Sequence, residues 1–169
     1  MAGFCTKTFI EHDDYMTPKS AWANIAHLLN PDKKYWEAFY GDGNSGIFLR
    51  ELGLKNVIHE PIDFFNNDTL PEYDILISNP PFSQAKNIMN RLYELDKPFI
   101  LIMPSSKICT MYFRNWHNKK LQIIIPRKRI QFIKLVDGKI PNNFKSHCNF
   151  DCFYYCYKIG LDKDINYLL

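Results

Sequence analysis

The stretch Tyr73-Asp74-Ile75-Leu76-Ile77-Ser78-Asn79-Pro80-Pro81-Phe82 decides the fold, because a short apolar run stops there at a polar, proline-rich turn. The run predicts a buried strand over residues 73–78. Apolar residues at helical spacing then predict a helix over residues 88–95, and the run 99–103 before Pro104 predicts the next buried strand. Strand, helix and strand in this order indicate a parallel sheet.

The same alternation extends upstream of this turn. Thr17-Pro18 predicts a helix start, with the threonine as N-cap and the proline in the first helical position, and the helix is expected to run through Leu29. Residues 35–40 and 57–58 predict two strands, with a helical stripe over residues 47–52 between them. We therefore expect an α/β fold with a Rossmann-like, doubly wound and mostly parallel sheet.

The C-terminal third is rich in strand-forming residues. Residues 121–125, 129–135 and 150–159 predict three strands, and we expect the last two to pair as an antiparallel hairpin at the sheet edge. A chain of 169 residues is about one domain long, and neither a linker nor a repeat divides it. Residues 1–169 are therefore expected to form a single domain.

The composition excludes several classes of protein. A hydrophobic fraction of 46% with 15% aromatic residues excludes a chain that is mostly disordered. No apolar stretch approaches the roughly 20 residues that a membrane helix needs, and the N-terminus lacks a signal-peptide pattern. We expect a soluble, intracellular protein without a membrane partner. The five cysteines, an odd number, favour free thiols in a reducing compartment.

Three of the cysteines are evenly spaced near the C-terminus. Cys148, Cys152 and Cys156 follow His147 and could be interpreted as a metal site. Their interval of four residues matches none of the usual pairs of zinc ligands. It also places all three on one face of a strand, where free cysteine is commonly buried. We predict buried thiols and no metal.

Positive charge is concentrated in residues 107–145, which we call the basic segment. This segment holds ten Lys or Arg against one Asp or Glu, although the whole chain has a net charge of only +3. Aromatic residues lie among the cations, so the segment suits a phosphate backbone and stacked bases, as well as an ordinary solvated face. The candidate nucleic-acid contacts are Lys107, Arg114, Arg127, Lys128 and Arg129.

Glycines gather in the loop after the first predicted strand. Gly41, Gly43 and Gly46 are three of only seven glycines in the chain. Glycine permits a tight turn and the close approach of a ligand to the backbone. In open α/β sheets, ligands bind beyond the carboxyl ends of the strands, where the strand order reverses. The loop is therefore a candidate ligand site, although Gly-Asp-Gly-Asn is also an ordinary turn.

The motif Asn79-Pro80-Pro81-Phe82 at a strand end resembles the signature of class I S-adenosylmethionine-dependent methyltransferases that modify adenine N6. In that family the signature is Asp, Asn or Ser, two prolines and an aromatic residue. Residues 17–22 resemble its N-terminal cofactor motif, residues 37–43 its glycine-rich motif and residues 63–65 its adenine-contacting motif. The resemblance is closest to small phage- and virus-type DNA N-6-adenine methyltransferases, which also carry an Arg-Ile-x-Phe strand like residues 129–132.

The resemblance implies an active site at Asn79, Pro80, Pro81 and Phe82. The adenine amine is a poor nucleophile, because its lone pair is delocalised into the ring. The Asn79 side-chain oxygen and the Pro80 carbonyl would accept its N–H bonds and localise that lone pair. Phe82 would stack on a base that has left its helix. The two prolines would keep the acceptors rigid.

The resemblance also implies S-adenosyl-L-methionine as cofactor. The backbone of the glycine-rich motif would hold the methionine part, Glu60 the ribose hydroxyls, and Asp63 and Phe64 the adenine. The implied cofactor-binding residues are Thr17, Pro18, Trp22, Glu37, Phe39, Gly41, Asp42, Gly43, Glu60, Asp63, Phe64 and Asn79.

The sequence departs from the longer family members after the second predicted strand. Only Pro61 and Ile62 separate Glu60 from Asp63, which leaves no room for the usual helix and strand between these two motifs. Glu60 is therefore equally well explained as an exposed carboxylate at a strand end. Thr17 is equally well explained as a helix N-cap.

Several alternatives remain for the substrate and partners. The same motif serves methyltransferases of RNA adenine, of cytosine N4 and of protein glutamine, and the basic segment disfavours glutamine. A catalytically silent nucleic-acid-binding subunit of the same fold is the alternative from another class. DNA is the expected partner, with RNA as the alternative. Because no separate target-recognition domain fits into the chain, a homodimer or a partner subunit would supply recognition, or the recognised site is very short. The Lys-, Ile- and Asn-rich composition suggests a virus or parasite with an A/T-rich genome.

Overall fold

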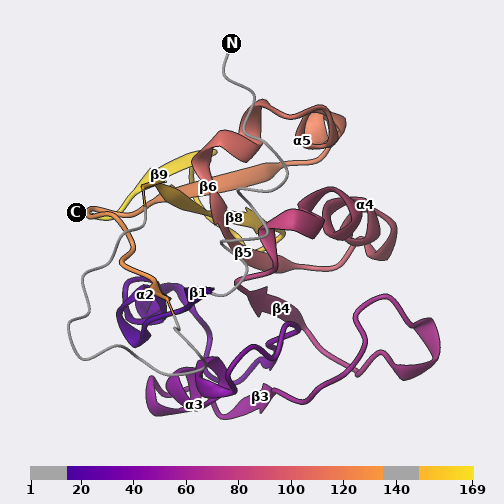
Figure 1. Ribbon diagram of the computed structural model, residues 1–169, viewed down its shortest axis with the longest axis vertical. Coiled ribbons are helices and arrows are strands. Elements are labelled where there is room, and N and C mark those ends of the chain that lie inside the picture. The colour runs from indigo at the N-terminus through magenta and orange to yellow at the C-terminus, as the bar shows by residue number, and fades with distance from the viewer. Residues whose placement is uncertain (1–14, 135–148) are drawn as a thin grey trace.

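The computed structural model describes residues 15–134 and 149–169, and seven of its strands form one sheet in the order β3-β2-β4-β5-β8-β6-β9 (Figure 1). The strands β3, β2, β4 and β5 are parallel to one another, and β9 is parallel to β6. Among the described strands of this sheet, only β8 runs antiparallel to its neighbours, β5 and β6. The expected α/β, Rossmann-like, mostly parallel sheet is therefore confirmed. The strands are β2 Lys34–Trp36, β3 Asn56–Ile58, β4 Ile75–Ser78, β5 Phe99–Pro104, β6 Leu121–Ile125, β8 Cys152–Tyr157 and β9 Ile165–Tyr167.

Helices cover the sheet from both sides, with α2 and α3 together on one side and α4 and α5 on the other (Figure 1). The apolar stripe of α4 is buried as its spacing predicts, and the helix ends at Asp96, whose φ of 50° is left-handed. The α-helices are α2 Lys19–Ala23, α3 Asn44–Glu51, α4 Ala85–Leu95 and α5 Met111–Arg114. Short 3₁₀ helices are η1 Ala26–Leu28, η2 Asn67–Thr69, η3 Phe82–Gln84, η4 Ser105–Cys109 and η5 Asn115–Asn118. Within residues 15–134 and 149–169, none of the helices has the length and apolar character that crossing a membrane requires.

The first helix is shorter than its sequence predicts. Its N-cap is Pro18 rather than Thr17, without a side-chain cap, and α2 ends at Ala23. The carbonyl of Ala21 accepts a hydrogen bond of 2.6 Å from the Tyr154 hydroxyl of β8. In a continuous helix that carbonyl would pair with the backbone N–H of Ile25, which bonds to Trp22 instead. A side chain distant in sequence therefore competes with the helix.

The two strands expected to form the C-terminal hairpin have other partners. Strand β8 lies inside the sheet, between β5 and β6. Five of its six residues are buried, as a strand covered on both faces requires. Strand β7, Ile133–Lys134, pairs with β1, Tyr15–Met16, in a separate antiparallel sheet. The expected antiparallel strands exist, but the pairing predicted between them is wrong.

The sheet reverses its strand order at β2. From β2 the chain moves to β3 on one side and later to β4 on the other side. Loops that follow neighbouring strands at such a reversal diverge, and the space between them is where open α/β sheets bind ligands. The residues at this position are those that follow Trp36 and Ser78.

Candidate active site

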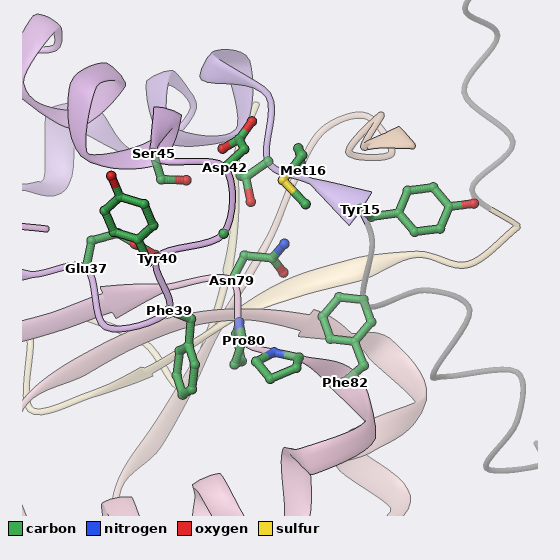
Figure 2. A pocket seen from close by; sticks show the side chains of 13 residues that line it. Tyr15, Met16, Glu37, Phe39, Tyr40, Asp42, Ser45, Asn79, Pro80 and Phe82 are labelled. Atoms are coloured by element: carbon green, nitrogen blue, oxygen red, sulfur yellow. The ribbon is translucent and has the colours of Figure 1, made fainter. Parts of the chain in front are cut away.

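A pocket of about 300 Å³ lies at the carboxyl ends of β2 and β4. Its wall comes from three segments: β1 with the residue after it, the loop that follows β2, and the proline-rich turn that follows β4 (Figure 2). Of the residues predicted for the site, the wall contains Thr17, Glu37, Phe39, Gly41, Asp42, Asn79, Pro80, Pro81 and Phe82. The structure therefore brings together residues up to 65 positions apart, from Thr17 to Phe82.

We call residues 39–46 the glycine loop; they lie between β2 and α3 and include the first turn of α3. Gly41 and Gly43 have φ angles of +56° and +81°, which are left-handed conformations that favour glycine. Asp42 accepts hydrogen bonds from the backbone N–H of Asn44 at 3.0 Å and from its side-chain amide at 2.7 Å. These contacts give the loop its shape before any ligand is bound.

Asn79 lies at the centre of the pocket. Figure 2 shows its amide between the chain of Met16 and the glycine loop on one side and Pro80 on the other. Its Oδ1 atom is buried and accepts no hydrogen bond from any residue in the described ranges. A buried acceptor without a partner costs about 1–3 kcal/mol. Such an atom at a pocket wall is typical of a site that a ligand completes with an N–H or O–H group.

Glu37 is a buried acid in the same wall, with 1% of its surface exposed. The Ser78 hydroxyl donates a hydrogen bond to its Oε1 atom, and the Nε2 atom of His59 lies 2.7 Å from its Oε2 atom. Burial raises the pKa of Glu37, while these two contacts act in the opposite direction. Glu37 therefore links the ends of β2, β3 and β4 beneath the pocket.

Phe82 does not present the free ring face that base stacking requires. Only 2% of its surface is exposed, because its ring packs edge-on against Phe132 at 6.4 Å and Phe150 at 5.7 Å. Tyr15 contacts the same two rings. We call Tyr15, Phe82, Phe132 and Phe150 the aromatic cluster. A base that stacks on Phe82 must displace one of these rings.

The other predicted cofactor residues lie outside the pocket wall. Trp22 is fully buried and donates a hydrogen bond of 3.3 Å to the hydroxyl of Ser45, which lines the pocket. Phe64 is buried and contacts Phe39 at a ring distance of 5.1 Å. Both therefore support wall residues from behind. Pro18, Gly43, Glu60 and Asp63 are also outside the wall, and the last two are exposed.

The candidate nucleic-acid contacts have different environments. Lys107 is buried, and its ammonium donates a hydrogen bond of 3.1 Å to the Phe82 carbonyl, so it supports the proline-rich turn rather than an exposed surface. Arg129 forms two hydrogen bonds with Asp151, at 2.9 and 3.0 Å, and holds the pKa of that carboxyl below its usual range. Arg114, Arg127 and Lys128 are exposed. The basic segment continues with Lys139 and Lys145, which lie outside the described residues.

Two of the evenly spaced cysteines, Cys152 and Cys156, are buried in β8 as free thiols, and burial raises the pKa of Cys156. Cys148 and His147 lie outside the described residues. Where the structure describes the chain, no three His, Cys, Asp or Glu side chains are grouped so that they could hold a metal ion.

Sequence reasoning missed His59 and the role of Gly46. Gly46 completes a Gly-x-Gly-x-x-Gly spacing with Gly41 and Gly43, in which the third glycine permits close packing of helix and strand. That spacing was a usable signal for Gly46. His59 carries no motif, and only the fold shows that it lies beside Glu37.

No protein-family model matches this chain, and no curated protein matches it. Among solved structures, the chain is similar to a precorrin-6y C5,15-methyltransferase from Geobacter metallireducens, with 14% sequence identity and a TM-score of 0.45. That match covers 87% of this chain and 95% of the other.

Proposed function

We propose that this protein transfers a methyl group from S-adenosyl-L-methionine to the exocyclic amino nitrogen N6 of adenine in DNA. The observation that carries the proposal is the Asn79 Oδ1 atom, a buried acceptor with no partner among the described residues, at the wall of a pocket beside the glycine loop. An amine substrate supplies the N–H group that this oxygen lacks. The family resemblance of the proline-rich turn gives the identity of the amine.

Asn79 would act on the amine before and during methyl transfer. An N–H group that donates to Oδ1 keeps the nitrogen lone pair out of conjugation with the ring and directs it toward the methyl group. The nitrogen lone pair would form the new N–C bond as the bond between the methyl group and sulfur breaks, with its electron pair staying on sulfur in the departing thioether. The nitrogen would become cationic and then lose one proton to solvent. Because Pro80 and Pro81 fix the backbone directly after Asn79, the acceptor needs little reorganisation.

The pocket contains groups that suit the cofactor. When bound, S-adenosylmethionine supplies an electrophilic methyl group on a sulfonium centre. The backbone of the glycine loop would hold its amino-acid part, and the acidic groups in the wall are Glu37 and Asp42, which belongs to the loop itself. Thr17 and Ser45 add hydroxyl groups to the wall. Glu60 and Asp63 remain candidates for the ribose and the adenine, at the exposed end of β3 and in the loop after it.

The charge of the basic segment supports a nucleic acid as the substrate. Residues 107–134 contain eight Lys or Arg and no Asp or Glu. Arg127 and Lys128 follow the carboxyl end of β6, which lies at the same edge of the sheet as Asn79. They are exposed and therefore available to phosphates.

The direct test measures methyl transfer with the whole protein. It is incubated with methyl-labelled S-adenosylmethionine and, separately, with single-stranded DNA, double-stranded DNA and RNA, and the digested nucleosides are then separated. The expected product is N6-methyladenine in DNA. Label in RNA alone would contradict the DNA substrate, and label in cytosine would contradict the adenine target. Cofactor binding without any transfer would support the silent subunit instead.

Variants of Asn79 test the role of its oxygen. Asn79→Leu removes the acceptor at similar volume and should lower the transfer rate by about 10²–10³-fold, the usual effect of losing one preorganised hydrogen-bond partner. Asn79→Asp keeps an acceptor and should retain measurable transfer. Asn90→Ala, an exposed change in α4, serves as the control and should leave the rate unchanged. Equal rates for Asn79→Leu and wild type would exclude the proposed role.

A further inference from the structure

His59 contacts three parts of the candidate active site at once. It directly follows β3 and is 9% exposed. Its Nδ1 atom accepts a hydrogen bond of 3.1 Å from the backbone N–H of Gly46. Its Nε2 atom lies 3.1 Å from the carbonyl oxygen of Tyr40 and 2.7 Å from Oε2 of Glu37. Both ends of the imidazole are therefore in contact with the glycine loop.

The close approach to Gly46 depends on the absence of a side chain there. A Cβ atom at Gly46 would lie 2.2 Å from Nδ1 of His59 and 2.5 Å from its Cβ atom. The Tyr40 ring covers the imidazole, with 4.7 Å between ring centres and 30° between ring planes. The glycine loop is thus fitted around this one side chain.

These contacts define the protonation state of His59. A backbone N–H is a donor only, so Nδ1 must present its lone pair to Gly46. The single ring proton is then on Nε2, where the Tyr40 carbonyl accepts it and Glu37 lies beside it. The imidazole is neutral in this arrangement.

The contacts of His59 continue to the proposed catalytic turn. Glu37 binds His59 through one carboxyl oxygen and the Ser78 hydroxyl through the other. Ser78 directly precedes Asn79. A change at His59 therefore reaches the glycine loop directly and Asn79 through Glu37 and Ser78.

We propose that His59 is a positioning residue that holds the glycine loop in its ligand-binding conformation only while the imidazole is neutral. The role in cofactor binding rests on the proposed function. A second ring proton would go to Nδ1, and its N–H would then oppose the N–H of Gly46. The loop would lose that contact, so a second proton on the ring should weaken ligand binding.

The groups around His59 come from the end of β2, the glycine loop and α3. The titratable groups that face it are Glu37 from the end of β2 and Tyr40 from the glycine loop. Burial raises the pKa of Glu37, while its contacts with His59 and Ser78 act in the opposite direction. Asp42 acts on Glu37 through its charge, α3 presents only the Gly46 backbone, and Glu60 next in sequence is exposed.

Nuclear magnetic resonance of the ¹⁵N-labelled protein tests the contact without any ligand. At about pH 8 the His59 ring should carry its proton on Nε2, and the Gly46 amide should be protected from hydrogen exchange. Wherever acidification protonates the ring, the protection of the Gly46 amide should be lost at the same pH. A proton on Nδ1 at pH 8, or a Gly46 amide that stays protected after the ring is protonated, would overturn the proposal.

Two variants and a control connect the contact to ligand binding. His59→Phe removes the acceptor and should weaken S-adenosylmethionine binding by about tenfold, measured by calorimetry. His59→Asn offers an acceptor that cannot be protonated, so it should bind at about pH 8 better than His59→Phe and should show no loss at pH 5. His27→Asn changes an exposed histidine and should behave like wild type. Melting curves identify any variant that fails to fold, and then the wild-type pH series decides.

The outcomes separate this proposal from the proposed function. If wild-type protein binds S-adenosylmethionine equally well with the His59 ring neutral and with the ring protonated, the positioning role is wrong and the cofactor assignment stands. If wild-type protein binds no S-adenosylmethionine at any pH, the proposed function fails. The ring proton and the Gly46 amide still decide whether His59 holds the loop.

Discussion

At the scale of single residues, Gly46 shows how the fit around His59 limits the sequence. It lies in the first turn of α3, where glycine is ordinarily a poor choice. The space that a side chain would need is occupied by the His59 ring. Glycine at this position therefore costs conformational entropy in the helix, but it allows α3 to contact His59, the residue after β3.

The sign of the change in the free energy of unfolding of a Gly46 variant tests this explanation. Glycine to alanine within a helix usually raises stability by about 0.5–1 kcal/mol. Gly46→Ala should instead lower the free energy of unfolding by about 1–3 kcal/mol, because the new methyl group overlaps the imidazole. Denaturant unfolding measures the difference, with the exposed Ile47→Ala as control on the same helix. A stabilised Gly46→Ala would show that His59 moves aside at little cost.

The sequence predicted part of the site at this scale. Asn79, the glycines and Glu37 could be found because they stand in ordered motifs at strand ends. Lys107 was predicted to contact nucleic acid because charge patterning does not distinguish an exposed lysine from one that bonds to the Phe82 carbonyl. The burial of Phe82 also could not be predicted, since Phe132 and Phe150 reach it from segments distant in sequence.

At the scale of secondary-structure elements, Asp96 joins three of them at the edge of the sheet opposite the pocket. It caps α4, and its carboxylate accepts hydrogen bonds from Lys119 at 2.6 Å, Tyr157 at 2.7 Å and Lys158 at 2.8 Å. Lys119 precedes β6, Tyr157 ends β8, and Lys158 follows it. These donors hold the pKa of Asp96 far below its usual range.

The lowered pKa of Asp96 makes its contribution to stability depend on pH. The ionised carboxylate stabilises the fold above the pKa of the unfolded chain, about 3.9, and this stabilisation declines as the pH falls below that value. Asp96→Asn, which tolerates the left-handed backbone, should be less stable than wild type at neutral pH. The difference should shrink on acidification. Unfolding curves at several pH values would contradict this expectation if the difference stayed constant.

Some elements could be predicted from the sequence and others could not. Strands β4 and β5 and helix α4 were predicted because their apolar periodicity is local. The early end of α2 could not be predicted, because it depends on a hydrogen bond to the Ala21 carbonyl from the Tyr154 hydroxyl, 133 residues away. The pairing of β8 could not be predicted from sequence either, since an apolar strand fits any position in a sheet where both of its faces are covered.

At the scale of the whole molecule, exposed positive charge lies on the same side of the sheet as the pocket, beyond the carboxyl ends of the parallel strands. Arg127 and Lys128 follow β6 on that side. Arg129 beside them is paired with Asp151. Arg127 and Lys128 form no ion pair with any residue in the ranges 15–134 and 149–169. If DNA approaches the pocket from this side, these two residues rather than Arg129 carry the phosphate contacts.

Reversing these charges should weaken DNA binding in a salt-dependent way. The double variant Arg127→Glu and Lys128→Glu should bind DNA more weakly, and the slope of log affinity against log salt should fall by about two, one for each lost phosphate contact. A matched control, Lys33→Glu and Lys163→Glu, changes the same net charge at exposed residues near the opposite sheet edge. Fluorescence anisotropy over a salt series measures both. An equal loss in the control would indicate a general effect of net charge.

The central place of β8 has a consequence for the order in which the molecule is completed. Strands β5 and β6 are made first, yet each bonds to β8 and not to the other. Until residues 152–157 leave the ribosome, both strands present an unpaired, apolar edge of the kind that invites aggregation. A late step of synthesis thus inserts a strand into the middle of the sheet, before β9 is added beside β6. A nascent chain that stops before Cys152 would depend on chaperones, although every residue of the pocket wall has already been made.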